Sequence, residues 1–210
     1  MLDMILRFAQ RMTRRVTDSL RRWRMKRLLR GIAHCGEYTR VDAPDLLAGL
    51  DGLRLGSRVT IRGHARIECI RFWGYSGEIH IGSGTSIQLY FHCGAASRVS
   101  IGENVLIAGR VYISDHDHAW PEGGEKLIVA PVTIGDNCWL GEGCAILKGV
   151  TLGTGCVVGA NAVVTRSAPP GSMLVGVPAR VVKRYCSQTG TWHRGDIDTS
   201  GVTEDERATD

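Results

Sequence analysis

The sequence predicts an all-β solenoid, a parallel β-helix built from six-residue units, and two observations carry this prediction. Aliphatic residues recur every six positions through the middle of the chain, at Ile134, Leu140, Ile146, Leu152, Val158 and Val164. The residue four positions after each of them is small or β-branched: Cys138, Cys144, Val150, Cys156, Ala162 and Ala168. An α-helix repeats about every 3.6 residues and a strand about every two, whereas one side of a triangular coil takes about six.

The composition agrees with one sizeable core and some appendages. The chain has 210 residues, of which 43% are hydrophobic and only 6% aromatic, and 27 are glycine, which suits tight corners around a narrow interior. No apolar run is long enough to predict a transmembrane helix. The arginine-dense N-terminus does not resemble a signal peptide.

Residues 1–54 are expected to form a basic amphipathic helix and a lead-in. The first 30 residues hold ten Arg or Lys against two Asp, a charge of +8, whereas the whole chain carries +5. Apolar residues recur with the spacing of one helix face, at Ile5, Phe8, Ala9, Met12, Val16, Leu20, Trp23 and Leu28. Such a face either caps the open end of the coil or lies on anionic lipid at the inner face of the membrane, and both interpretations stay open.

The coil is expected over residues 55–185. The earlier aliphatic positions fall into three separate phases, 55–67, 81–87 and 101–113, so an insertion must leave the coil at each change of phase. The longest insertion, loop 114–131, is polar, rich in Gly and Pro, and carries two histidines. Solenoids usually place their function on such loops. The tail 186–210 is polar, lacks the hexad and is expected to be disordered.

The cysteines predict no disulfide framework. Cys138, Cys144 and Cys156 share one inward position of the hexad, and no two cysteines form a CxxC pair. Free cysteine behaves as a small buried hydrophobe, so these three are interpreted as core residues. A cytoplasmic protein is therefore expected.

Five stretches resemble the hexapeptide-repeat acyltransferases: Ile134–Gly141, Gly149–Gly153, Val158–Thr165, Pro169–Gly171 and Val175–Arg180, the last reading Val-Gly-Val-Pro-Ala-Arg. They are most similar to the sugar and polysaccharide O-acetyltransferases of the maltose, galactoside and nodulation-factor type. The resemblance covers about residues 55–185. It implies a left-handed parallel β-helix, a homotrimer, and acetyl-CoA as the co-substrate, bound in a groove between neighbouring coils. No metal is expected.

The resemblance also implies a base. A free alcohol is a poor nucleophile at neutral pH, and histidine is suited to accepting its proton. The segment from Ile113 aligns with the family segment that ends in a catalytic histidine five positions later, which makes His118 the expected base and His116 the alternative. Asp115 or Asp117 would orient the imidazole. The His-x-His spacing leaves a metal site open as another interpretation, and so is simple surface decoration.

A backbone N–H near Gly141 and Glu142 is the implied donor to the oxyanion of the tetrahedral intermediate. The sequence departs from the family at Glu142, where serine or alanine is usual. The backbone N–H can still donate after that change, whereas glutamate has no hydroxyl group to contact the cofactor.

The resemblance implies further cofactor contacts farther along the coil. Gly159 and Ala160 would leave room for the pantetheine arm, and Thr165 and Arg166 would meet the distal end of CoA. The cations Arg180 and Lys183 would pair with its phosphates, or else form a solvated basic surface.

The acceptor is expected to be a saccharide hydroxyl, on a cell-envelope polysaccharide precursor, because a basic helix suits a nucleotide-linked or lipid-linked sugar. The aromatic insertion around Phe72, Trp73 and Tyr75 either stacks on sugar or fills a subunit interface. Two alternatives differ in chemistry: an N-acetyltransferase of an amino sugar or small amine, and a metal-dependent enzyme of the carbonic anhydrase type. No nucleic acid partner is expected.

Overall fold

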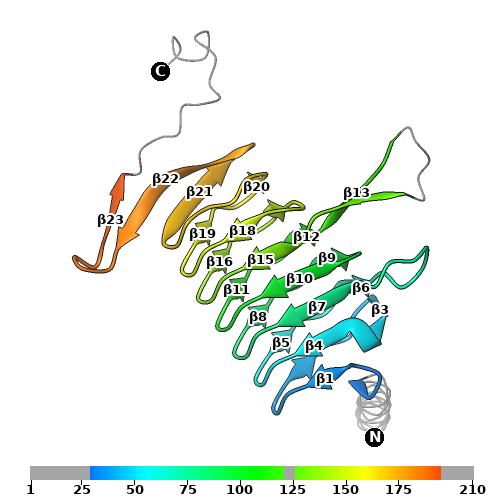
Figure 1. Ribbon diagram of the computed structural model, residues 1–210. Helices are drawn as coiled ribbons and strands as arrows, with labels where there is room; N and C mark the ends of the chain where they lie inside the picture. Colours follow the sequence, from blue (N-terminus) through cyan, green and yellow to red (C-terminus); the bar gives the residue numbers. More distant parts are fainter. Residues whose placement is uncertain (1–28, 121–125, 195–210) are drawn as a thin grey trace, which may run out of the picture.

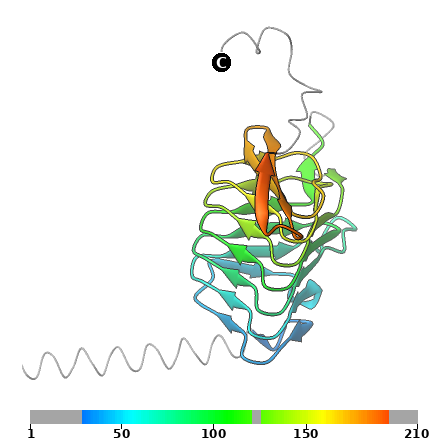
Figure 2. The same ribbon diagram turned by 90° about the vertical axis from the view of Figure 1, so that its left-hand side faces the viewer.

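The hexad positions face the interior of a three-sided coil in the computed structural model, which describes residues 29–120 and 126–194. Each turn of the coil adds one strand to each of three sheets, and the turns stack along one axis (Figures 1 and 2). Side chains such as Ile61, Ile113 and Leu140 are fully buried in the resulting column. The predicted all-β solenoid is confirmed, and its parallel pairing is consistent with the expected left-handed β-helix.

The first sheet is polar on its outer side and runs in parallel order through β1 (His34–Cys35), β4 (Leu53–Leu55), β7 (Glu78–Ile81), β10 (Arg98–Ile101), β15 (Val132–Ile134) and β18 (Thr151–Leu152). The third sheet consists of β3 (Leu46–Ala48), β6 (Arg66–Cys69), β9 (His92–Ala95), β12 (Tyr112–Ser114), β17 (Ala145–Ile146) and β20 (Val163–Val164). A short 3-10 turn, η1 (Leu50–Gly52), precedes β4.

The second sheet continues past the last turn of the coil. It contains β2 (Arg40–Val41), β5 (Thr60–Ile61), β8 (Ser86–Ile87), β11 (Leu106–Ile107), β16 (Trp139–Leu140), β19 (Val157–Val158), β21 (Ser172–Gly176), β22 (Ala179–Cys186) and β23 (Thr191–Arg194). The pairing is parallel up to β21 and antiparallel for β22 and β23. The last two strands therefore form an extension beyond the coil (Figure 1).

The coil begins earlier than the expected boundary at residue 55. Strands β1, β2 and β3 pair in register with β4, β5 and β6, so residues 34–48 form a complete first turn. Cys35, Val41 and Leu47 already follow the six-residue spacing. The turn escaped prediction because an exposed cysteine stands at its first hexad position. Residues 1–28, where the amphipathic helix is predicted, lie outside the described residues.

The expectation of a disordered tail from residue 186 is wrong for residues 187–194. These residues turn back and pair with β22 through strand β23. Trp192 lies opposite Tyr185, with the two ring centroids 5.4 Å apart. Such cross-strand aromatic pairs stabilise antiparallel strands without any six-residue repeat. Residues 195–210 lie outside the described residues.

The predicted insertions leave the coil at one corner, between the third and first sheets. Residues 70–77 lie between β6 and β7, and a small antiparallel sheet of β13 (His116–His118) and β14 (Leu127–Val129) lies between β12 and β15. The remaining phase change falls at the same corner. Cys93 pairs with Ile67 and Ile113 and continues the phase of Ile87, and the eight residues from Cys93 to Ile101 are two more than one hexad. Both insertions project from the same edge of the molecule (Figure 1).

Candidate active site

The two histidines singled out by the sequence lie on the hairpin β13–β14. His116 pairs with Val129 and His118 with Leu127 across this hairpin. At its base, the Ala130 N–H donates to the carbonyl oxygen of Asp115, at 2.8 Å. The loop 114–131 is thus an ordered β-ribbon where the structure describes it, and its base is attached to the edge of the third sheet.

Asp115 is a fully buried carboxylate at the base of the hairpin. Its Oδ1 accepts a hydrogen bond from the Ala96 N–H at 2.8 Å, and its Oδ2 accepts one from the Ser97 N–H at 2.7 Å. Burial alone would raise the pKa of this carboxyl. Hydrogen bonds from His116 and from the two backbone N–H groups outweigh burial, so the pKa of Asp115 is lowered. The carboxylate is therefore ionised at neutral pH.

His116 is held by that carboxylate. Its Nδ1 lies 2.9 Å from Asp115 Oδ1, and its side chain is only 15% exposed. Because an ionised carboxylate can only accept, Nδ1 carries the proton and donates it, which leaves a lone pair on Nε2. The ring covers Gly94, where an added Cβ would stand 3.1 Å from His116 Cε1. This dyad has the arrangement of a general base with an orienting acid.

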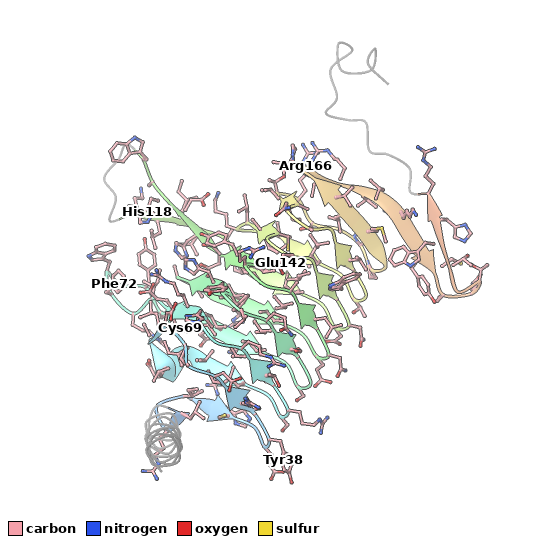
Figure 3. The ribbon with its side chains drawn as sticks, turned by 180° about the vertical axis from the view of Figure 1, so that it is seen from behind. Tyr38, Cys69, Phe72, His118, Glu142 and Arg166 are labelled. Carbon is pink, nitrogen blue, oxygen red and sulfur yellow. The ribbon has the colours of Figure 1, made fainter. Side chains whose placement is uncertain are left out.

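His118, the residue expected to be the base, lies two residues farther along β13 and is exposed. Between the two histidines, Asp117 forms an ion pair with Lys148. Figure 3 shows His118 beside the outer edge of the hairpin. The structure thus brings His116 and Asp115 together, and the role of His118 stays a prediction.

Two further residues beside the dyad were not part of the predicted catalytic set. His92 on β9 and Tyr112 on β12 are neighbours in the third sheet, and their rings meet edge to face at 5.2 Å. Burial, and to a smaller extent nearby Arg66, lowers the pKa of His92. Their twenty-residue spacing equals one turn of the coil, which is the pattern that could have placed them side by side.

Gly141 and Glu142 lie at a different corner, between the second and third sheets. The Gly141 N–H donates to the Val158 carbonyl at 2.8 Å, whereas the Glu142 N–H has no acceptor among the described residues. The Glu142 carboxylate accepts from the Gly109 N–H at 2.7 Å and pairs with Arg110 at 2.9 Å. The glutamate that replaces the usual serine or alanine therefore holds the preceding turn of the coil. Strand β17 separates this corner from the hairpin, and Figure 3 shows Glu142 and His118 apart.

The other predicted cofactor residues lie along the last turns. Gly159 follows β19, and an added Cβ there would stand 2.9 Å from Val175 Cγ1. Ala160, Thr165 and Arg166 are exposed at the corners of the last turn. Gly159 and Ala160 stack directly on Gly141, since an added Cβ at Gly141 would lie 2.7 Å from the Ala160 nitrogen.

Arg180 and Lys183 lie on β22, in the extension beyond the coil. Arg180 is partly buried and donates from Nη1 to the Ala179 carbonyl at 3.1 Å. Lys183 is exposed and lies opposite Arg194 of β23. Residues 172–194 contain no acidic side chain, so both cations stand in a positive stretch of chain.

Among residues 29–120 and 126–194, no group of three or more His, Cys, Asp or Glu side chains could hold a metal ion. Within the same residues, no helix has the length and apolar character needed to cross a membrane.

Comparison with known proteins gives consistent matches. Residues 131–166 match the family described as the hexapeptide repeat of succinyl-transferase. A putative lipopolysaccharide biosynthesis O-acetyltransferase of Escherichia coli (strain K12) is 35% identical over 130 residues, 56% of this chain and 66% of that protein. The galactoside O-acetyltransferase of the same strain is 36% identical over 128 residues, 59% of this chain and 63% of that protein. The chain therefore spans slightly less than two thirds of the length of each relative.

A solved structure has a similar fold. The hexapeptide-repeat acetyltransferase VCA0836 of Vibrio cholerae, complexed with acetyl-CoA, aligns with a TM-score of 0.54 and 22% identity, over 79% of this chain and 77% of that one.

Proposed function

This chain belongs to the hexapeptide-repeat acyltransferase family, and from that premise we propose that it transfers an acetyl group from acetyl-CoA to a hydroxyl of a saccharide. The observation that carries this proposal is the dyad of buried Asp115 and largely buried His116 at the inserted hairpin. A base held in one tautomer by a carboxylate is what activation of an alcohol requires. The names of the two bacterial relatives, both O-acetyltransferases, support the reaction class.

In the proposed reaction His116 is the base. Its Nε2 takes the proton of the acceptor hydroxyl while the oxygen attacks the thioester carbonyl. Asp115 keeps the proton on Nδ1 and stabilises the imidazolium that forms. When the carbon–sulfur bond breaks, the imidazolium returns its proton to the departing thiolate of CoA. The products are an acetyl ester and free CoA, and His118 is the alternative base.

The oxyanion of the intermediate needs a donor. The Glu142 N–H is a candidate because it has no acceptor within the described residues. It lies across the third sheet from His116, so one chain does not bring base and donor together. A second copy that presents its Gly141–Glu142 corner to this hairpin would complete the site. We therefore propose a homotrimer in which each site is shared by two subunits.

The cofactor would extend from the same corner along the coil toward its last turns. The backbone at Gly159 and Ala160 would lie along the pantetheine arm, with the Val175 side chain beside Gly159. Thr165 and Arg166 are exposed and would meet the distal end of CoA. Arg180 and Lys183 would pair with phosphate, since charge-assisted hydrogen bonds suit those groups.

The acceptor class follows from the relatives. One is named for lipopolysaccharide biosynthesis and the other for galactosides, so a cell-envelope saccharide precursor made at the cytoplasmic side of the membrane is the proposed substrate. Contact of residues 1–30 with that membrane face belongs to this proposal, although residues 1–28 lie outside the described part of the chain.

Acetyl transfer is tested by mixing the purified full-length chain with acetyl-CoA and following release of free thiol. Mono- and oligosaccharides, nucleotide-linked sugars and amino sugars serve as acceptors. We expect thiol release that depends on a saccharide hydroxyl and yields an alkali-labile ester. Transfer only to amines would assign N-acetylation instead. If no acceptor in the panel increases the release of thiol, the result contradicts the proposal.

Assembly is tested by sedimentation equilibrium. The expected mass is three times the 22.9 kDa of one chain. A mass of one chain at working concentration would contradict the shared site, because the base and the Glu142 N–H would then remain on opposite edges of one sheet.

A further inference from the structure

The hairpin that carries both histidines is a two-stranded ribbon that leaves the coil. Such a ribbon is only marginally stable by itself in water. Among the described residues, two side chains from other turns of the coil form polar contacts with the strands of the hairpin. Tyr75 comes from the insertion between β6 and β7, and Lys148 comes from the corner between β17 and β18.

Tyr75 supports the hairpin from an earlier turn. Its hydroxyl oxygen accepts a hydrogen bond from the Leu127 N–H at 2.9 Å. Leu127 is buried in a small apolar cluster with Ile70 and Ala96, against which Tyr75 and Val129 pack. Leu127 lies opposite His118 in the hairpin. The hydrogen bond to Tyr75 therefore fixes strand β14 at a residue that pairs with a histidine.

Lys148 supports the hairpin from a later turn. Its ammonium group forms an ion pair with Asp117, the residue between the two histidines. The Lys148 side chain is 30% exposed and that of Asp117 is 53% exposed. The pair therefore joins strand β13 to a part of the coil 31 residues farther along the chain.

We propose that Tyr75 and Lys148 are positioning residues, which together hold the hairpin so that its histidine stands over Gly94 and faces the acceptor. The catalytic part of this claim rests on the proposed function. It also gives the aromatic insertion a role other than sugar stacking or subunit contact: its tyrosine supports the strand opposite the histidines. Small displacements of a catalytic base lower the rate strongly. The two contacts lie beside or opposite the histidines in the hairpin, so losing them should lower the rate of acetyl transfer.

The holding role is tested without any assay of activity. Amide hydrogen exchange of residues 116–118 and 127–129 is measured in the full-length protein and in Tyr75→Phe, Lys148→Met and the double variant. Loss of an exposed ion pair should speed exchange about two- to fivefold, and loss of the hydroxyl should do the same or more. Lys148→Arg should restore the wild-type rate. Arg40→Met, on β2, removes a comparable surface pair with Asp42 and should leave the exchange rates of the hairpin unchanged.

The catalytic consequence is tested with the acetyl-transfer assay. Lys148→Met and Tyr75→Phe should lower kcat by about tenfold to a hundredfold with little change in the KM for acetyl-CoA. Unchanged exchange in both variants would overturn the holding role, and faster exchange with unchanged kcat would overturn the positioning role. If the wild-type protein transfers no acetyl group, the proposed function fails, while the exchange rates still decide whether the two residues hold the hairpin.

Discussion

Replacing His116 with alanine should lower the rate of acetyl transfer by about two to four orders of magnitude, the usual contribution of general acid–base catalysis. The imidazole is held by Asp115 at 2.9 Å and is largely covered, so water cannot take its place in the same orientation. The KM for acetyl-CoA should change little, because the proposed cofactor contacts lie at another corner of the coil. Steady-state kinetics with a saturating acceptor provide the measurement.

His118→Ala is the matched control, since it removes the same side chain two residues away on the same strand. It should lower kcat much less than His116→Ala does. The reverse order would restore His118 as the base, as the family alignment first indicated. Equal and small effects of both substitutions would show that neither histidine of the hairpin acts as the base.

The fold could be predicted because a single physical constraint repeats. Each side of the coil admits one inward aliphatic residue every six positions, so the period alone identified the solenoid, and the phase changes located its insertions. The first turn escaped because Cys35 lies at the exposed end of the described coil, where an aliphatic residue is not required. Strand β23 escaped because it is held by an antiparallel neighbour and a Tyr185–Trp192 contact, neither of which leaves a hexad.

The sequence singled out the loop that forms the β13–β14 hairpin, but residue spacing alone did not distinguish its two histidines. Residues 116 and 118 are two apart, and alternate residues of a strand point to the same side, so spacing treats them alike. What distinguishes them is contact with Asp115 and Gly94, and Gly94 lies on an earlier turn of the coil. The sequence likewise did not reveal that the Gly141–Glu142 corner is separated from the hairpin. That separation depends on which two sheets each corner connects.

Asp115→Asn should lower kcat by about two to four orders of magnitude while the hairpin stays in place. Asp115 accepts three hydrogen bonds, from the Ala96 and Ser97 N–H groups and from His116 Nδ1. An asparagine has one acceptor oxygen, so its NH₂ group must face either the Ser97 N–H or both the Ala96 N–H and His116. In the second case the imidazole turns to the tautomer with its proton on Nε2, which cannot act as a base. The kcat of the variant with a saturating acceptor is the measurement.

The same substitution should lower the free energy of unfolding at pH 7 by about 1–3 kcal/mol, because an N–H group bound to the Asp115 carboxylate, that of Ala96 or of Ser97, loses its acceptor in either orientation. The pKa of Asp115 is lowered in the folded protein from an ordinary value of 3.8. Its contribution to stability is therefore complete above about pH 4 and is lost as the pH falls through the lower, folded-state value. Urea unfolding at one fixed protein concentration should thus show a gap between wild type and Asp115→Asn that is constant from pH 5 to 7 and narrows in acid. A gap that widens in acid would mean that the folded protein binds the proton on Asp115 more tightly than the unfolded chain does. The carboxylate could then not be the ionised partner that fixes the tautomer of His116.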